Sequence, residues 1–179
     1  MQRQRLRPHL PFRAVNRCGY PGYDPELQRH HLLPRQLLTE PCFGSLFEAV
    51  RPRQLGFNDF RRNGLLLPAS DEATIATGLP LHRGPHRHYN RMVIERFGLI
   101  ENDWSRQRLR RPNRAREQAL FRIGLLQRAL RRRLLDPIGR RVSLNSRDPL
   151  GHAIDFSELD AMAELLWNAA VEAENAELR

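Results

Sequence analysis

Residues 27–34 read LQRHHLLP, and residues 61–68 read RRNGLLLP. Each segment contains a short apolar run that stops at a proline, a residue with no backbone N–H to offer a strand ladder. An Asn-Gly pair, which is typical of turns, stands directly before the second apolar run. We therefore predict two short strands, over residues 27–33 and 64–67.

Apolar side chains recur three and four residues apart in four other segments, as they do on one face of a helix. We predict helices over 43–50, from Pro85 to Gly98, over 113–135 and over 155–178. Proline suits the first turn of a helix, and glycine commonly stops one. The resulting order is an irregular arm, strand, helix, strand and three helices. The predicted fold class is α+β and mostly helical.

The composition predicts a polyanionic partner. All 30 basic residues among the 179 are arginines, and 20 acids leave a net charge of +10. A chain of this charge attracts nucleic acid first, an anionic membrane second and an acidic protein third. Guanidinium groups match phosphate with two parallel hydrogen bonds. A codon bias toward arginine would produce the same composition without any such partner.

Charge is unevenly distributed along the chain. Residues 105–147 carry a balance of +12, whereas residues 152–179 carry −6. The acidic segment shields the basic one, competes with nucleic acid for its surface, or is simply a packing helix with a charged outer face. No apolar run approaches the roughly 20 residues of a membrane span, and the N-terminus lacks the apolar core of a secretory signal. We therefore predict neither a membrane span nor a signal peptide.

Five of the seven histidines fall into two groups, His30-His31 and His82, His86 and His88. On a helix, His82 and His86 would face the same way and form a two-ligand clamp for a divalent ion. Adjacent strand residues point to opposite faces, so one of the early pair is free to reach the ion while the other reaches elsewhere. Metal-assisted phosphodiester hydrolysis needs this division between ligands and a base. Taken singly, each group also fits an ordinary structural role.

The strings LQRHHLLP, RRNGLLLP and LHRGPHRHYN, in this order, resemble the AHH nucleases of the HNH/endonuclease VII superfamily, also called ββα-metal or His-Me finger. That family is known mainly as toxin domains of bacterial polymorphic toxin systems. The resemblance covers about residues 27–97. Arg29 stands where the family has the alanine of its Ala-His-His motif. The resemblance implies a small ββα-metal core with added α-helices.

The same resemblance implies roles for single residues. His30 corresponds to a metal ligand and His31 to the general base. His82 and His86 correspond to the remaining ligands. Asn63 corresponds to the central asparagine of the HNH motif, which would hold the loop of the base and orient its imidazole.

Four further side chains are candidates for contact with the substrate: Arg29, Arg83, Arg87 and Tyr89. The implied cofactor is one divalent metal ion, Mg²⁺ or Zn²⁺. Imidazole ligands suit Zn²⁺ or another transition ion, whereas Mg²⁺ often supports catalysis in the superfamily. An unperturbed histidine has a pKa near 6.5, so a histidine base predicts loss of activity in acid.

We predict three parts, which together form one structural domain. Residues 1–26 form a basic irregular arm, residues 27–100 the HNH/AHH-like nuclease core, and residues 101–179 a helical extension packed on that core. The sequence gives no indication of the oligomeric state.

The resemblance implies a metal-dependent endonuclease that hydrolyses DNA with little sequence specificity and acts as a bacterial toxin or effector. RNA is the other candidate substrate. An acidic immunity protein is the expected partner, and the expected location is the cytoplasm of the producing cell or of a target cell. One alternative is a non-catalytic nucleic-acid-binding module whose histidines hold a structural metal. Another is a housekeeping or phage endonuclease with no toxic role.

Overall fold

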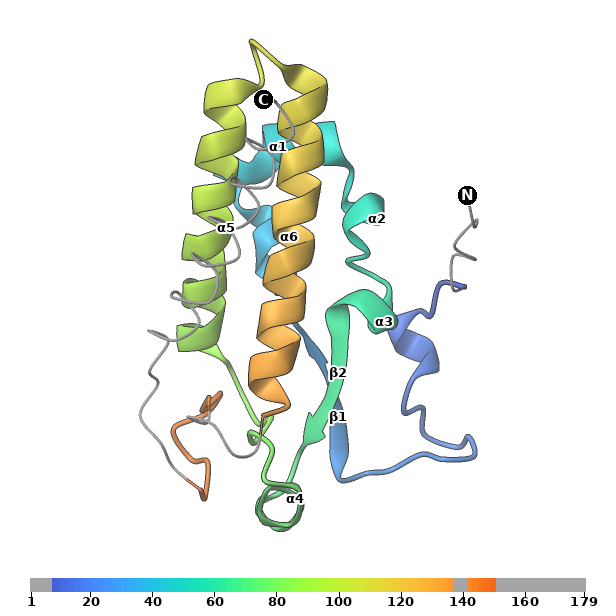
Figure 1. Ribbon diagram of the computed structural model, residues 1–179. Coiled ribbons are helices and arrows are strands. Elements are labelled where there is room, and N and C mark those ends of the chain that lie inside the picture. The colour runs from blue at the N-terminus through green and yellow to red at the C-terminus, as the bar shows by residue number, and fades with distance from the viewer. Residues whose placement is uncertain (1–7, 137–141, 151–179) are drawn as a thin grey trace.

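The computed structural model describes residues 8–136 and 142–150. A small antiparallel sheet of two strands lies beside a long helical hairpin, with a short helix at each end of the second strand (Figure 1). This architecture confirms the predicted α+β class, mostly helical. Among the described residues, no helix has both the length and the apolar character needed to cross a membrane.

The two predicted strands are confirmed as β1 (Leu27–His31) and β2 (Gly64–Pro68), paired with His31 opposite Gly64. β1 ends two residues earlier than predicted. The reason is that the Leu33 N–H donates to the side chain of Asn63 and not to a strand partner. The chain therefore leaves the sheet directly after the histidine pair.

The connection between the strands consists of short helical segments. They are η2 (Arg35–Thr39), η3 (Pro41–Phe43), α1 (Gly44–Val50), α2 (Pro52–Leu55) and α3 (Phe60–Asn63). The predicted helix over 43–50 is confirmed by α1, whose apolar face is buried. Because α3 runs directly into β2, it sets the position of Asn63 at the start of that strand.

A helix that the sequence analysis missed, α4 (Asp71–Thr77), follows β2. Its signals are local: the Ser70 hydroxyl accepts from the Ala73 N–H at the N-cap, and Gly78 has a φ of 69° at the C-cap. These are preferred residues at both positions. The helix was missed because it lacks an apolar stripe, and Ile75 is exposed.

Helices α5 (Arg87–Gln107) and α6 (Pro112–Leu134) form the long hairpin seen in Figure 1. The predicted helix over 113–135 is confirmed by α6. The predicted helix from Pro85 to Gly98 is wrong at both ends, since α5 begins at Arg87 and continues well past Gly98. Buried Ile100 and Trp104 extend the apolar stripe beyond this glycine. Their packing offsets the cost of one glycine in a helix, about 1 kcal/mol.

The described part of the N-terminal arm packs against α3. It contains a short 3-10 turn, η1 (Phe12–Ala14), and Pro11 forms an isolated bridge with Asp59. The Phe60 N–H donates to the Leu10 carbonyl at 2.7 Å. The predicted acidic helix over 155–178 lies outside the described residues.

Candidate active site

Three histidine rings converge beside the sheet. His30 comes from β1, His82 from the loop before α5, and His86 from the N-cap of α5. The ring centroids lie 5.0 Å apart for His30 and His82, 5.6 Å for His30 and His86, and 4.4 Å for His82 and His86. One nitrogen from each ring lies within 4.8 Å of the others. A single divalent ion can bridge nitrogens at such separations.

The helical clamp predicted for His82 and His86 is wrong in its geometry. Both residues precede α5, in a loop where Gly84 has a φ of 78° and Pro85 offers no N–H. Such a φ favours glycine, and the turn that it makes brings the two rings together without a helix. The His82 N–H donates to the Pro68 carbonyl at 2.7 Å, which ties the loop to the end of β2.

The three rings fit a metal ion. His82 Nδ1 lies 3.2 Å from Gln28 Oε1, and His86 Nδ1 lies 3.1 Å from the Leu144 carbonyl oxygen. A carbonyl only accepts, so Nδ1 of His86 carries the proton and Nε2 keeps a lone pair; histidine ligands of metals are held in this way. His30 is 3% exposed, and among the described residues its buried Nε2 has no hydrogen-bond partner. A metal ion would satisfy this nitrogen.

The electrostatics keep these rings neutral. Burial lowers the pKa of His30 well below its ordinary value, and the neighbouring histidines lower it further. Burial, with His86 nearby, lowers the pKa of His82 to about 4, and burial also lowers the pKa of His86. Neutral imidazole is the form that binds a metal, so all three rings are in the metal-binding form at neutral pH.

The metal-free protein is therefore expected to lose stability as the pH falls from 7 toward 4. The unfolded chain takes up protons on these histidines near pH 6.5, whereas the folded protein resists protonation until about pH 4 in the case of His82. The melting temperature measured in chelator should be lower at pH 5 than at pH 7. His82→Gln should reduce this fall, and His88→Gln on the exposed surface should not. An equal fall in the wild type and His82→Gln would contradict the prediction.

His31 projects from the opposite face of β1, and its ring stacks on Phe12 at a centroid distance of 3.8 Å. Burial lowers the pKa of His31 to about 4, and the charges of Arg35 and Arg29 add to this effect. The proximity of His31 also contributes to the lowered pKa of both His30 and His82. At neutral pH His31 is thus a neutral imidazole, one residue along the chain from His30.

Asn63 is fully buried and bonds to the main chain. Its Oδ1 accepts from the Leu33 N–H at 2.8 Å, and its Nδ2 donates to the carbonyls of Leu33 and Phe57. These bonds hold the backbone two residues beyond His31. The contact made by Asn63 is with the loop that follows the histidine pair, and the described bonds do not reach the imidazole of His31.

The four candidate substrate contacts fall into two groups. Arg29, Arg83 and Arg87 are exposed, and each stands next to one of the three histidines in the sequence. Tyr89 is only 1% exposed, and its hydroxyl donates to the Leu32 carbonyl at 2.8 Å. Its ring also meets the edge of His30 at 5.0 Å. Tyr89 therefore supports the site from the core and is not placed to touch a phosphate.

Two residues near the site were missed. Arg35 follows Pro34, and its charge reaches His31. Gln127 on α6 is 4% exposed, and its Nε2 donates to the Leu55 carbonyl and to Asn63 Oδ1. A polar side chain within an otherwise apolar helical stripe was the available signal for Gln127. Its partners are more than sixty residues away, so the sequence alone did not identify them.

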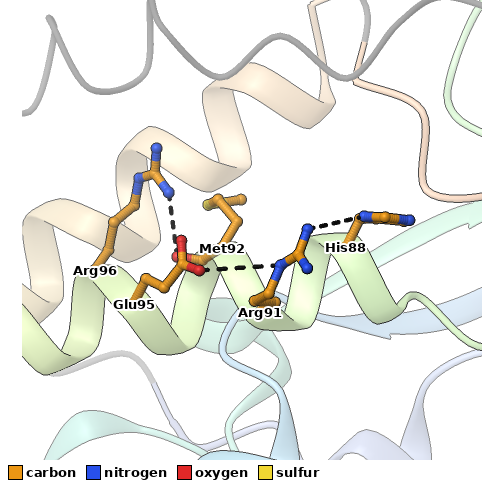
Figure 2. Close-up of polar contacts among 5 residues, drawn as sticks. All are labelled: His88, Arg91, Met92, Glu95 and Arg96. Carbon is orange, nitrogen blue, oxygen red and sulfur yellow. Dashed lines mark hydrogen bonds and ion pairs between the residues drawn. The ribbon is translucent and has the colours of Figure 1, made fainter.

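His88, the third histidine of the later group, does not join the site. Figure 2 shows it on the surface of α5 beside Arg91, whose Nη2 lies 3.2 Å from His88 Nδ1. Arg91 also pairs with Glu95 at 3.9 Å. His88 thus provides a matched histidine control outside the site.

Asn63→Ala is expected to destabilise the protein strongly. The substitution leaves the buried Leu33 N–H and one donor of Gln127 without an acceptor, and each such group costs about 1–3 kcal/mol. Urea unfolding of Asn63→Ala and of the exposed Asn58→Ala should show a large loss only in the first. Equal unfolding free energies in the two variants would contradict this assignment.

A two-stranded antiparallel sheet, a helix with a histidine at its N-cap and three converging imidazoles define a candidate metal centre of the ββα-metal class. The family model for AHH, a nuclease family of the HNH/ENDO VII superfamily with conserved AHH, matches residues 12–132. This protein belongs to that family, and nucleic acid is the substrate class of its nucleases. The match extends beyond the expected residues 27–97 into the arm and through most of α6. Neither a curated protein nor a solved structure matches the chain.

Proposed function

We propose that this protein is a metal-dependent endonuclease that hydrolyses phosphodiester bonds of DNA with little sequence specificity. The observation that carries the proposal is the convergence of His30, His82 and His86, with the buried Nε2 of His30 lacking a partner among the described residues. His31, on the other face of β1, supplies a separate neutral imidazole. Ligands and a base are thus available from different side chains.

His31 would take a proton from water while the water oxygen attacks phosphorus and the bond from phosphorus to the leaving oxygen breaks. His30, His82 and His86 would hold the divalent ion. When bound, such an ion supplies positive charge to the scissile phosphate and the departing oxygen. Arg29 and Arg35, whose charges act on His31, would neutralise the phosphate near the base.

Arginines support binding to the nucleic-acid backbone. Contacts to phosphate position a nucleic acid without reading its sequence, and their strength falls with salt. The net charge of +10 and the exposed Arg83 and Arg87 near the ligands favour this mode. We propose DNA as the substrate, with RNA as the alternative outcome of the cleavage assay.

The biological role that we propose is that of a bacterial toxin or effector nuclease, neutralised by an acidic immunity protein. The strong positive charge favours an acidic partner. Expression should then be toxic to bacteria, and His31→Ala should relieve the toxicity. An active enzyme that is harmless when expressed would favour a housekeeping or phage role.

The decisive experiment is the conversion of supercoiled plasmid in the presence of Mg²⁺, Mn²⁺ or Zn²⁺, with and without chelator. We expect nicked and linear products that depend on the divalent ion, and similar rates on plasmids of unrelated sequence. Parallel reactions with structured RNA separate the two substrate classes. A protein that binds Zn²⁺ and plasmid but cuts neither nucleic acid with any ion would be a binding module with a structural metal.

A further inference from the structure

Phe12 lies face to face with His31. The centroids of the two rings are 3.8 Å apart, and their planes are 2° from parallel. The ring of Phe60 contacts the ring of Phe12 in an edge-to-face arrangement, with centroids 5.1 Å apart. An imidazole in such a stack loses the face-to-face contact when its ring turns out of this plane. The plane of the His31 imidazole is therefore fixed by an aromatic side chain from the N-terminal arm.

Phe12 is itself anchored to the elements around the site. Its carbonyl accepts from Arg29 Nη1 at 3.0 Å, and Arg29 lies on the same face of β1 as His31. The neighbouring Leu10 is held to α3 at both of its backbone groups: its carbonyl accepts from the Phe60 N–H, and its N–H donates to Asp59 Oδ1. Hydrogen bonds to β1 and α3 therefore hold in place the segment of the arm that carries Phe12.

The other candidate for orienting the base works differently. Asn63 bonds to the main chain of Leu33 and fixes the backbone after the histidine pair. A fixed backbone still leaves the imidazole free to rotate about its side-chain bonds. The stack on Phe12 limits this rotation.

We propose that Phe12 is a positioning residue that holds the His31 imidazole in the orientation needed to accept a proton from water. This inference rests on the proposed function, because it takes His31 as the base. Phe12 has no group that exchanges a proton or binds an ion, so it acts only through His31.

The stack can be tested by NMR of the metal-free protein, without any catalysis. The ring current of Phe12 should shift the ring protons of His31 upfield, and their resonances are assigned by their loss in His31→Ala. Phe12→Leu should remove the upfield shift and Phe12→Tyr should keep it. Unchanged His31 resonances in Phe12→Leu would overturn the inference.

Kinetics test the positioning role. A general base contributes about 10²–10⁴-fold, and a misplaced one loses part of this, so Phe12→Leu should lower kcat roughly tenfold. The KM and metal affinity of Phe12→Leu should stay within about twofold of the wild type. Phe12→Tyr keeps an aromatic ring and should therefore keep the wild-type kcat. Phe121→Leu, on the exposed surface of α6, is the matched control and should cut like the wild type. Thermal unfolding of each variant verifies that it is folded.

A double-mutant cycle separates positioning from a general structural role. The cycle is measured on the residual cleavage of His31→Ala, about 10²–10⁴-fold below the wild type, and Phe12→Leu should not lower this residual rate further, because there is no base left to position. An equal further loss in both backgrounds would overturn the inference. If His31→Ala is inactive and Phe12→Leu is fully active, only this inference fails. If His31→Ala cuts like the wild type, the base of the proposed function is itself wrong.

Discussion

His31→Ala is expected to abolish cleavage while leaving metal binding intact. Loss of a general base lowers the rate by about 10²–10⁴-fold. His31 leaves β1 on the opposite face from His30 and lies outside the group of three converging nitrogens. The divalent ion should therefore bind the variant as tightly as it binds the wild type, within about twofold.

The measurement pairs plasmid cleavage rates with calorimetric titration of Zn²⁺. His88→Ala is the matched control, since His88 is exposed on α5 and contacts Arg91 at its surface. This control should retain both plasmid cleavage and Zn²⁺ binding. Wild-type cleavage by His31→Ala would refute the base assignment, and loss of metal binding would make His31 a ligand.

The second large effect is expected at the ligands. His82→Ala and His86→Ala should each lose both metal binding and cleavage. Removing a residue that supports a ligand typically costs 10–100-fold in metal affinity, so removing a ligand should cost more than about 100-fold. Loss of the ion removes the charge that stabilises the scissile phosphate, and the rate should fall with it.

A graded variant makes this prediction sharper. Gln28→Leu removes only the acceptor that faces Nδ1 of His82, at 3.2 Å in the wild type. Its Zn²⁺ affinity should fall by about 10–100-fold, between that of the wild type and that of His82→Ala, and added metal should restore its cleavage. Retention of wild-type affinity in both His82→Ala and His86→Ala would exclude these histidines as ligands.

The strands and most of the helices follow from local features of the sequence. The apolar runs before Pro34 and Pro68 predicted both strands, and the apolar stripe of α6 predicted that helix nearly to its ends. These signals act between residues a few positions apart, where periodicity and the missing N–H of proline decide the conformation. The grouping of histidines predicted that one of His30 and His31 would join His82 and His86, and the family resemblance selected His30.

Local signals failed where distant packing decides. Gly98 was expected to end a helix, but Ile100 and Trp104 continue the apolar stripe in the core, and α5 continues with them. The clamp of His82 and His86 was expected on one helix, and it is made instead by the turn at Gly84. His82 and His86 do converge, but through a local geometry other than the predicted helix.

Composition and local spacing were enough to predict the fold class, the two strands, the basic charge and the histidines that could act together. Only the tertiary structure placed Phe12 on His31 and Gln127 on Asn63, because these contacts join segments about twenty and more than sixty residues apart. Such contacts follow from how whole elements pack, and no spacing rule specifies them. The candidate site residues can therefore be named from the sequence, whereas the side chains that orient His31 and support Asn63 are identified only in the folded structure.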